Sequence, residues 1–260
     1  MQKDKPRIIQ AVQRAIEILE CFDSLDMELQ LGELSKKVNL NKSTAHGILA
    51  TLIYHDYVHQ NPETGAYKLG PKILEKGLQM LGRMNTYQVV RPHLLNIAKK
   101  YRQTTHLFLY VNGVLFCADK VETASFVVLS SRIGHRHPLH ASASGKVILA
   151  NLDRSSLNAV IENIKFTRFT AKTISSPKEL LDTLPDIQAR GYALEDEEIE
   201  EGIYSAAVPI WSYQGLLGTI SISGLRNHML SIKEEVVRDL IESAELASRE
   251  FGHPMLSQNT

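Results

Sequence analysis

Hydrophobic residues recur every three or four positions in two short segments near the start of the chain. Residues 31–38 form the first segment, and Asn39, Leu40 and Asn41 interrupt its pattern. A second segment then runs from Lys42 to about Tyr54. Its apolar residues follow i, i+3, i+4, i+7 and i+8 spacing and are Ala45, Ile48, Leu49, Leu52 and Ile53. Two short helices across a tight turn, with small and polar residues on the outer face of the second, are typical of a helix-turn-helix.

Two short strand-like runs follow this helical pair, at residues 57–59 and 66–69. Turn-forming residues at 61–65 join them, so the pattern predicts a β-hairpin wing behind the second helix. A preceding helix is expected to close the same core with one apolar stripe, which consists of Ile8, Val12, Ala15, Ile16, Leu19 and Phe22. The alternative interpretation is a helical hairpin and an unrelated β-hairpin that serve only as a core.

The pattern after residue 70 predicts helices mixed with strands. Helices are expected over 72–83, 87–101, 144–151, 154–164, 177–190 and 231–251, and strands over 107–111, 114–121, 126–133, 204–211 and 215–223. This order favours an α+β fold. We predict two domains, a winged helix-turn-helix with a linker helix in residues 1–84 and a sheet domain in residues 85–260. Residues 72–101 hold more apolar positions than one small domain needs, so they predict dimer contacts or, equally, a rigid spacer.

Charge does not by itself indicate a nucleic-acid partner. The chain has 29 basic and 29 acidic side chains, and residues 1–70 carry 8 of the former and 9 of the latter. The cations nevertheless lie at the ends of the two short helices and on the wing.

Two cysteines, Cys21 and Cys117, are too few for a disulfide framework or a zinc finger. No apolar run approaches the ~18 residues of a membrane span, and the start lacks a signal peptide, so we expect a cytoplasmic protein without a membrane partner.

Several of these segments together resemble the IclR family of bacterial transcriptional regulators. They are NKSTAHGILATL with YVHQNPETGAYKLG, then residues 138–150, 191–202 and 205–224, and they cover nearly the whole chain in the expected order. The resemblance implies a GAF-like α/β effector-binding domain and a homodimer or dimer of dimers that binds palindromic double-stranded operator DNA, most often as repressor of a catabolic operon. The expected DNA-binding residues are Lys36, Lys42, Ser43, Thr44, His46, Gly47 and Lys68. Many members carry arginine where this chain has Gly47.

Polar residues interrupt the apolar strands of the second domain. Ser221 and Ser223 are two apart and share a sheet face, while Ser205 starts the neighbouring strand. Ser144 lies at a helix start, where free N–H groups favour an anion. These residues predict a small polar cavity for a carboxylate; alternatively, the strand backbone satisfies the serines.

The resemblance implies the same effector pocket, lined by Ala143, Ser144, Glu195, Ser205, Ser221 and Ser223. Some members have glycine at Ala143, and aspartate and cysteine are frequent at Glu195 and Ser205. We expect Glu195 to accept a hydrogen bond from a hydroxyl of the ligand, which favours a hydroxy or sugar acid over a plain dicarboxylate. The expected effector class is a small carboxylate, namely a hydroxy, keto or sugar acid. At most one or two carboxylates of the acidic run 195–201 are expected to point inward.

No enzyme motif fits the chain. Gly145-Lys146 resembles part of a phosphate loop, but His140 and Val147 stand where that motif needs glycine and serine or threonine. No cofactor is expected. His135, His137 and His140 offer the one alternative, a metal-dependent enzyme or metal sensor. Because Pro138 breaks the segment and it holds no acidic ligand, hydrogen-bonded or solvated histidines are the default interpretation.

Overall fold

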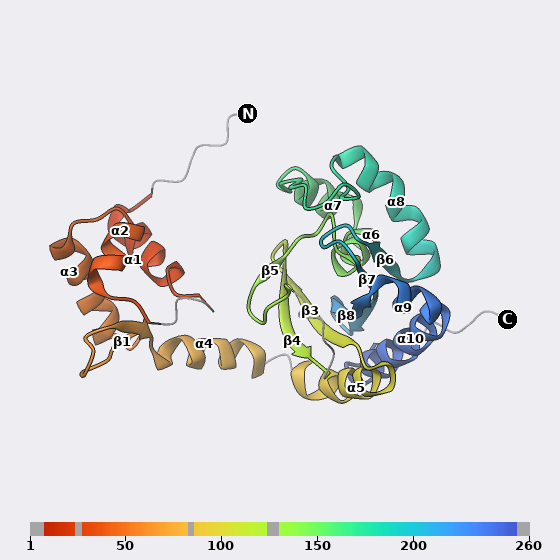
Figure 1. Cartoon of the computed structure of the whole chain (residues 1–260), viewed down its shortest axis with the longest axis horizontal. Coiled ribbons are helices and arrows are strands. Elements are labelled where there is room, and N and C mark those ends of the chain that lie inside the picture. The colour runs from red at the N-terminus through yellow and green to blue at the C-terminus, as the bar shows by residue number, and fades with distance from the viewer. Residues whose placement is uncertain (1–7, 24–27, 83–85, 124–129, 254–260) are drawn as a thin grey trace. The chain divides into compact units, whose positions relative to one another are not determined.

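A computed structural model describes residues 8–23, 28–82, 86–123 and 130–253. The chain forms two compact units, residues 1–84 and 85–260 (Figure 1). The helices of the first unit are α1 (Gln10–Glu20), α2 (Leu31–Lys37), α3 (Lys42–Tyr54) and α4 (Pro71–Gly82). Between α3 and α4, strand β1 (Val58–Gln60) pairs antiparallel with β2 (Tyr67–Leu69). This order of elements is a winged helix-turn-helix, as the sequence predicts.

Local hydrogen bonds fix the turn between α2 and α3. Gln30 and Glu33 form a capping box at the start of α2, in which the Gln30 backbone N–H donates to the Glu33 carboxylate at 2.7 Å. Asn39 then takes a left-handed conformation, with φ of 50°. The Asn41 side chain caps α3 by accepting the Thr44 backbone N–H at 2.8 Å. These contacts set where α3 begins and which residues lie in its first turn.

Only the last part of α1 packs into the core of the first unit, so the predicted stripe is wrong for its first half. Ile18 and Phe22 are buried against residues of α2, α3 and the wing. Ile8, Val12 and Ile16 are 64%, 54% and 50% exposed. The helix-turn-helix is too small to cover all of α1, and its first half therefore presents apolar side chains to solvent.

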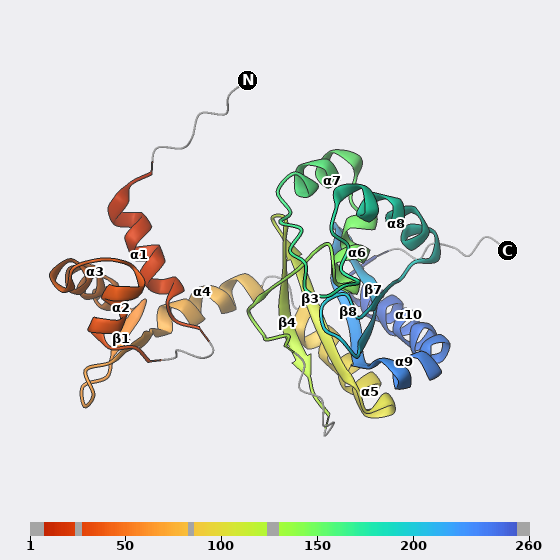
Figure 2. The ribbon, with the colours of Figure 1, turned by 45° about the horizontal axis from the view of Figure 1, so that its top comes forward.

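The second unit is an antiparallel sheet with helices on both faces (Figure 2). The strand order is β5-β4-β3-β8-β7-β6. The strands are β3 (Thr104–Val111), β4 (Val114–Val121), β5 (Arg136–His137), β6 (Ala193–Asp196), β7 (Ile203–Ser212) and β8 (Gly215–Leu225). The helices are α5 (Thr86–Tyr101), α6 (Ala143–Ala150), α7 (Arg154–Ile161), α8 (Pro177–Arg190), α9 (Arg226–Ser231) and α10 (Lys233–Glu250).

Alternation along the strands divides the core into two layers. Residues such as Leu107, Val208 and Ile220 pack against α5 and α10 on one face of the sheet. Phe108 and Ala207 point to the opposite face, where they pack with residues of α6 and α8. Ser205 of β7 and Ser221 and Ser223 of β8 are on the α6 side, so their polar side chains lie between the sheet and α6.

Three elements differ from the sequence prediction. Residues 130–133 form no strand, and residues 126–129 of that predicted strand lie outside the described part of the chain. The edge strand is instead β5, a two-residue segment that pairs with β4 and is too short for an alternating pattern. Strand β6 and the short helix α9 were not predicted, whereas α10 corresponds to the helix expected over 231–251. No helix among the described residues is long and apolar enough to cross a membrane.

Candidate ligand cavity and nucleic-acid interface

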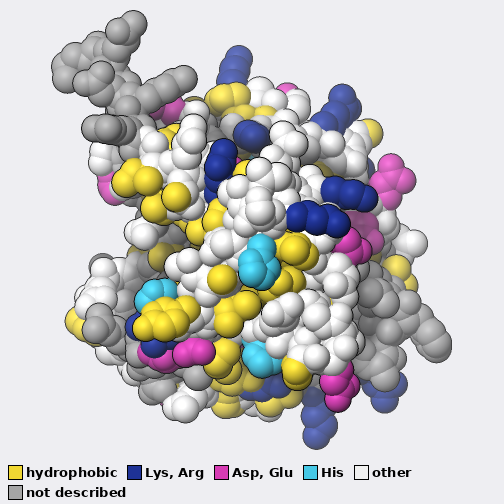
Figure 3. Space-filling model, turned by 90° about the vertical axis from the view of Figure 1, so that its left-hand side faces the viewer, with side chains coloured by type: hydrophobic (Ala, Val, Ile, Leu, Met, Phe, Trp, Pro, Cys, Tyr) yellow, Lys and Arg dark blue, Asp and Glu magenta, His cyan; other side chains and the backbone are white. Residues whose placement is uncertain are grey.

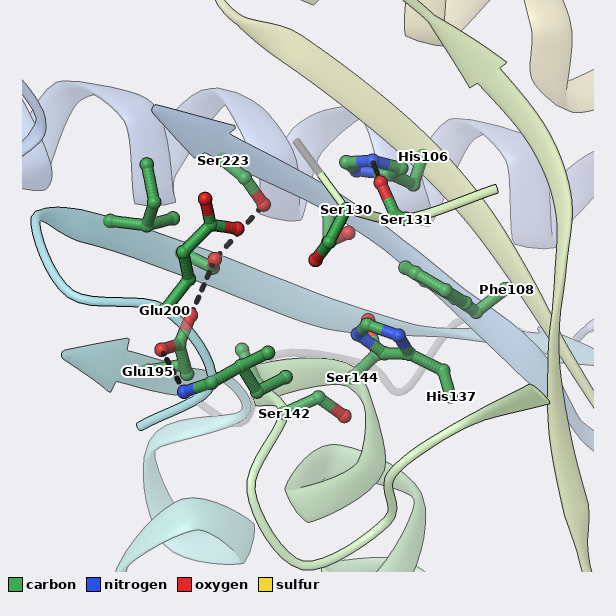
Figure 4. A pocket seen from close by; sticks show the side chains of 15 residues that line it. His106, Phe108, Ser130, Ser131, His137, Ser142, Ser144, Glu195, Glu200 and Ser223 are labelled. Atoms are coloured by element: carbon green, nitrogen blue, oxygen red, sulfur yellow. Dashed lines mark hydrogen bonds between the residues drawn. The ribbon is translucent and has the colours of Figure 1, made fainter. Parts of the chain in front are cut away.

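Strand pairing places three polar residues in one row across the sheet. Glu195 on β6 lies opposite Ser205 on β7, and Ser205 lies opposite Ser223 on β8. The Ser223 hydroxyl donates to the Ser205 hydroxyl at 2.9 Å, and the Ser205 hydroxyl donates to a Glu195 carboxylate oxygen at 2.8 Å (Figure 4). Ser221 pairs with His106 on β3 in the next row. This face of the sheet is therefore one wall of a polar cavity.

The start of α6 forms the opposite wall. The Ser142 hydroxyl caps the helix by accepting the Gly145 N–H at 2.9 Å, and it donates to the Pro138 carbonyl at 2.6 Å. The Ser144 hydroxyl is buried in the cavity wall without a hydrogen-bond partner among the described residues. A side chain at Gly145 would lie 2.3 Å from the Leu139 carbonyl oxygen, so only glycine permits this close approach. The packing holds the Ser144 hydroxyl and the helix start at the cavity.

An aromatic wall completes the cavity. The Phe108 ring stacks on His137 with centroids 4.5 Å apart and on His106 with centroids 5.4 Å apart. Figure 4 shows Phe108 between the two imidazoles, across the cavity from Glu195 and Glu200. Burial lowers the pKa of His106 to about 3 and that of His137 to about 4, so both rings are neutral at pH 7. The His106 Nε2 lies 2.8 Å from the Ser131 hydroxyl, while its Nδ1 is buried and has no hydrogen-bond partner in the described part of the chain.

The acidic run 195–201 folds back as a tightly held loop. One Glu195 carboxylate oxygen accepts the backbone N–H groups of Glu198 and Ile199, at 2.7 and 3.2 Å. Glu198 forms a buried ion pair with Lys146 of α6. Asp196 accepts two bonds from Arg226, at 2.5 and 3.0 Å. The run therefore has three inward carboxylates instead of the expected one or two. Burial raises the pKa of Glu195 and of Glu198, and Glu200 lines the cavity.

All six residues expected to form the pocket line this one cavity. Glu195 already accepts three hydrogen bonds, and an ionised carboxylate has about four acceptor positions, so one remains for a ligand hydroxyl. Sequence reasoning missed several lining residues, which are His106, Phe108, Ser130, Ser131, Ser142, Ile199, Glu200 and Ile203. Only alternation in β3 could have indicated two of them from sequence, because His106 and Phe108 are two residues apart and share a face of the strand.

The three histidines of the metal hypothesis do not converge. His137 stacks on Phe108 in the cavity, and the His140 Nε2 lies 3.0 Å from the Thr167 carbonyl oxygen. His135 is exposed. Within the described ranges, no group of three or more His, Cys, Asp or Glu side chains is placed to hold a metal ion. The metal-dependent alternative therefore has no geometric support.

The outer face of α3 is open to solvent. Lys42, Ser43, His46 and Gly47 are exposed, and the Ser43 hydroxyl donates to the Asn41 cap at 2.9 Å. Lys36 is exposed at the end of α2. Lys68 on the wing forms an ion pair with Glu28, at 3.1 Å. Figure 3 shows basic side chains scattered among neutral and apolar ones on the side that faces the viewer, without one continuous positive patch.

Comparison with known families identifies the class of protein. Residues 11–62 match the IclR helix-turn-helix domain, and residues 78–249 match the family described as the bacterial transcriptional regulator IclR C-terminal. The chain therefore belongs to the IclR family. It is a ligand-responsive, DNA-binding transcriptional regulator.

Relatives match this assignment, and solved structures match the fold, over nearly the whole chain. The HTH-type transcriptional regulator XynR of Escherichia coli is 37% identical over 95% of this chain and 99% of its own. The structure of Thermotoga maritima IclR is 31% identical, with a TM-score of 0.75, and covers 94% of this chain and 99% of its own. An IclR homologue from Microbacterium hydrocarbonoxydans complexed with 4-hydroxybenzoate has a TM-score of 0.83 at 22% identity, covering 93% of this chain and 99% of its own.

Proposed function

We propose that the protein represses a catabolic operon and that a small hydroxy, keto or sugar acid in the cavity controls its binding to operator DNA. The observation that carries this proposal is the buried Ser144 hydroxyl at the start of α6, which bonds to none of the described residues and faces a polar row of serines. A ligand carboxylate can accept bonds from that hydroxyl and from the helix N–H groups, whose partial positive charge favours an anion.

The acidic residues of the cavity set the orientation of such a ligand. Glu195 and Glu200 line it, and no lysine or arginine does so among the described residues. A second carboxylate beside them would be repelled, whereas a hydroxyl can donate to the remaining acceptor position of Glu195. The cavity volume of about 40 Å³ suits a small molecule, since one water needs about 10–15 Å³ on the same measure. A small hydroxy acid offers a carboxylate to Ser144 and the start of α6, and a hydroxyl to Glu195.

Names of relatives support repression and an acidic ligand. They include the transcriptional repressor IclR of Escherichia coli, 27% identical, and the acetate operon repressor of Salmonella typhimurium, 27% identical. The structural neighbour from Microbacterium hydrocarbonoxydans binds 4-hydroxybenzoate, a hydroxy acid. The operator partner is double-stranded DNA read by the exposed residues of α3, by a homodimer or a dimer of dimers. Ligand binding shifts the population between DNA-competent and incompetent states by its differential affinity for them.

Gel-shift assays with the DNA upstream of the protein's own gene test this function. The protein is titrated alone and with a panel of small hydroxy, keto and sugar acids, each beside the matching amide. We expect retarded DNA and one class of acid that changes the affinity, with no effect of its amide. Operator binding that no acid alters would contradict the regulatory part of the proposal.

A further inference from the structure

A second cavity lies between the end of the β3–β4 hairpin, α7 and the segment before α6. Its volume is about 830 Å³, in the range of pockets that hold drug-sized molecules. The hairpin contributes Tyr110 and residues 112–115, and α7 contributes one helical face through Ser156, Ala159 and Val160. The tip of the hairpin approaches α7, because a side chain at Gly113 would lie 4.0 Å from Val160. The cavity is therefore a groove with one wall from the β3–β4 hairpin and one from α7.

The groove is apolar inside and basic at its rim. Leu115 and Leu139 are buried beneath it, and Phe169 at its edge is 45% exposed. Arg136 and Lys165 line it and are exposed, and neither forms an ion pair within the described ranges. None of the described residues that line it is Asp or Glu. Its charge is thus opposite to that of the first cavity, which holds Glu195 and Glu200.

One side of the groove is aromatic and held in place. The His140 Nε2 bonds to the Thr167 carbonyl at 3.0 Å, which fixes the ring. The same ring lies against Phe169, with centroids 5.9 Å apart and planes at 24°. A flat apolar group can pack on this surface while an anionic group reaches the cations at the rim. The groove therefore matches an amphipathic anion better than a sugar or a cation.

We propose that this groove is a second ligand site, for a carboxylate carried on an aromatic or extended apolar body. The occupant packs between α7 and Phe169 and places its charge near Arg136 and Lys165. His137 lines both cavities, so such a ligand contacts the residue that stacks on Phe108 in the first. The proposal goes beyond the hydroxy-acid effector, because it concerns separate residues and a different class of ligand.

Calorimetry with biphenyl-4-carboxylate and the full chain tests the site. We expect measurable binding that Ala159→Trp abolishes, since an indole on the groove face of α7 fills the space. Asn158→Trp is the matched control, because Asn158 is exposed on the same helix and does not line the groove. The double variant Arg136→Gln/Lys165→Gln should weaken binding by about tenfold, as expected for two exposed charges.

Three outcomes would overturn the proposal. The first is no binding of biphenyl-4-carboxylate to the wild-type chain at millimolar concentration. The second is equal binding to Ala159→Trp, which would locate the probe elsewhere. The third is equally tight binding of the uncharged biphenyl-4-carboxamide, which would remove the role of the cations. Ser223→Ala should leave probe binding unchanged, so failure here is distinguishable from failure of the hydroxy-acid proposal.

Discussion

Ser223 on β8 lies directly opposite Ser205 on β7 and donates its hydroxyl to the Ser205 hydroxyl at 2.9 Å. Ser205 in turn bonds to Glu195, so the three side chains form one chain of hydrogen bonds across the wall of the first cavity. A ligand that bonds to Ser223 or Ser221 therefore contacts side chains whose positions are already set by neighbours.

We expect Ser221→Ala or Ser223→Ala to weaken effector binding by about 1–3 kcal/mol, because each change leaves a buried ligand group unpaired. Calorimetry with the acid found in the gel-shift screen measures this effect. Ser212→Ala is a suitable control, since Ser212 ends the same strand as Ser205 and does not line the cavity. Alanine variants that bind the acid as tightly as wild type would show that the serines serve the sheet alone. Operator binding without ligand should not change.

Lys146 and Glu198 form a buried ion pair that joins α6 to the acidic loop. Their side chains are only 6% and 12% exposed. We expect Lys146→Met to destabilise the second unit by about 3 kcal/mol, because a carboxylate is left buried without its partner. Adding Glu198→Gln should restore most of that loss. Urea unfolding of the three proteins measures the coupling, and a single variant as stable as wild type would contradict it.

Acid should destabilise the protein through His106. Its pKa is about 3 in the folded chain and about 6.5 in the unfolded chain. The unfolded chain therefore binds a proton at this residue before the folded chain does, so the free energy of unfolding decreases as the pH falls from 6.5 towards 3. At pH 5.5 the expected loss from this residue is about 1 kcal/mol. His137, with a pKa of about 4, adds a similar loss, while Glu195 and Glu198, whose pKa values are raised, act in the opposite direction.

Urea unfolding at pH 7.5 and pH 5.5 tests this prediction. The difference in unfolding free energy between the two pH values should be about 1 kcal/mol smaller in His106→Gln than in wild type. His46→Gln serves as the control, because it removes an exposed imidazole from α3 of the other unit. An identical pH dependence in wild type and His106→Gln would refute the assignment.

Local pattern was sufficient for most of the fold and for four serines of the cavity, while Ala143 and Glu195 came from the family resemblance. Ser221, Ser223 and Ser205 could be placed on one face because strand spacing fixes the side of each residue. His106 and Ser131 could not be joined in advance, since their contact depends on how residues far apart in sequence meet. Strand β5 could not be predicted either, because two residues are too few to show an alternating pattern. Strand β6 runs into acidic residues that are typical of a solvated loop, and only the structure shows that Lys146 and Arg226 pair with residues of this run.

The exposed half of α1 was the clearest error, because an amphipathic pattern does not tell what covers the apolar face. Ile9, Val12 and Ile16 are each at least half exposed there. We predict that a second copy of the chain covers this face and that the protein is at least a dimer. The mass measured by light scattering at micromolar concentration should therefore exceed the monomer mass of 29.2 kDa.

Charge placed on the same face tests that prediction. Val12→Asp/Ile16→Asp should shift the protein towards the monomer without loss of folding, because both side chains are exposed in the single chain. Gln10→Asp, which adds one negative charge at the start of the same helix, should leave the mass unchanged. A monomeric wild-type protein would exclude binding of one dimer to two operator half-sites. A double variant that remains a dimer would show that the interface lies elsewhere.

Lys42 begins α3 with an exposed ammonium beside the Asn41 cap, where it can reach a DNA phosphate from the first turn of the helix. We expect Lys42→Ala to weaken operator binding and to reduce the slope of log affinity against log salt by about one unit, because one fewer counterion is released. Lys178→Ala is the matched control, since Lys178 is equally exposed but lies on α8 of the second unit. Fluorescence anisotropy over a range of salt concentrations gives both slopes. If the slopes of Lys42→Ala and wild type coincide, Lys42 does not contact the phosphates.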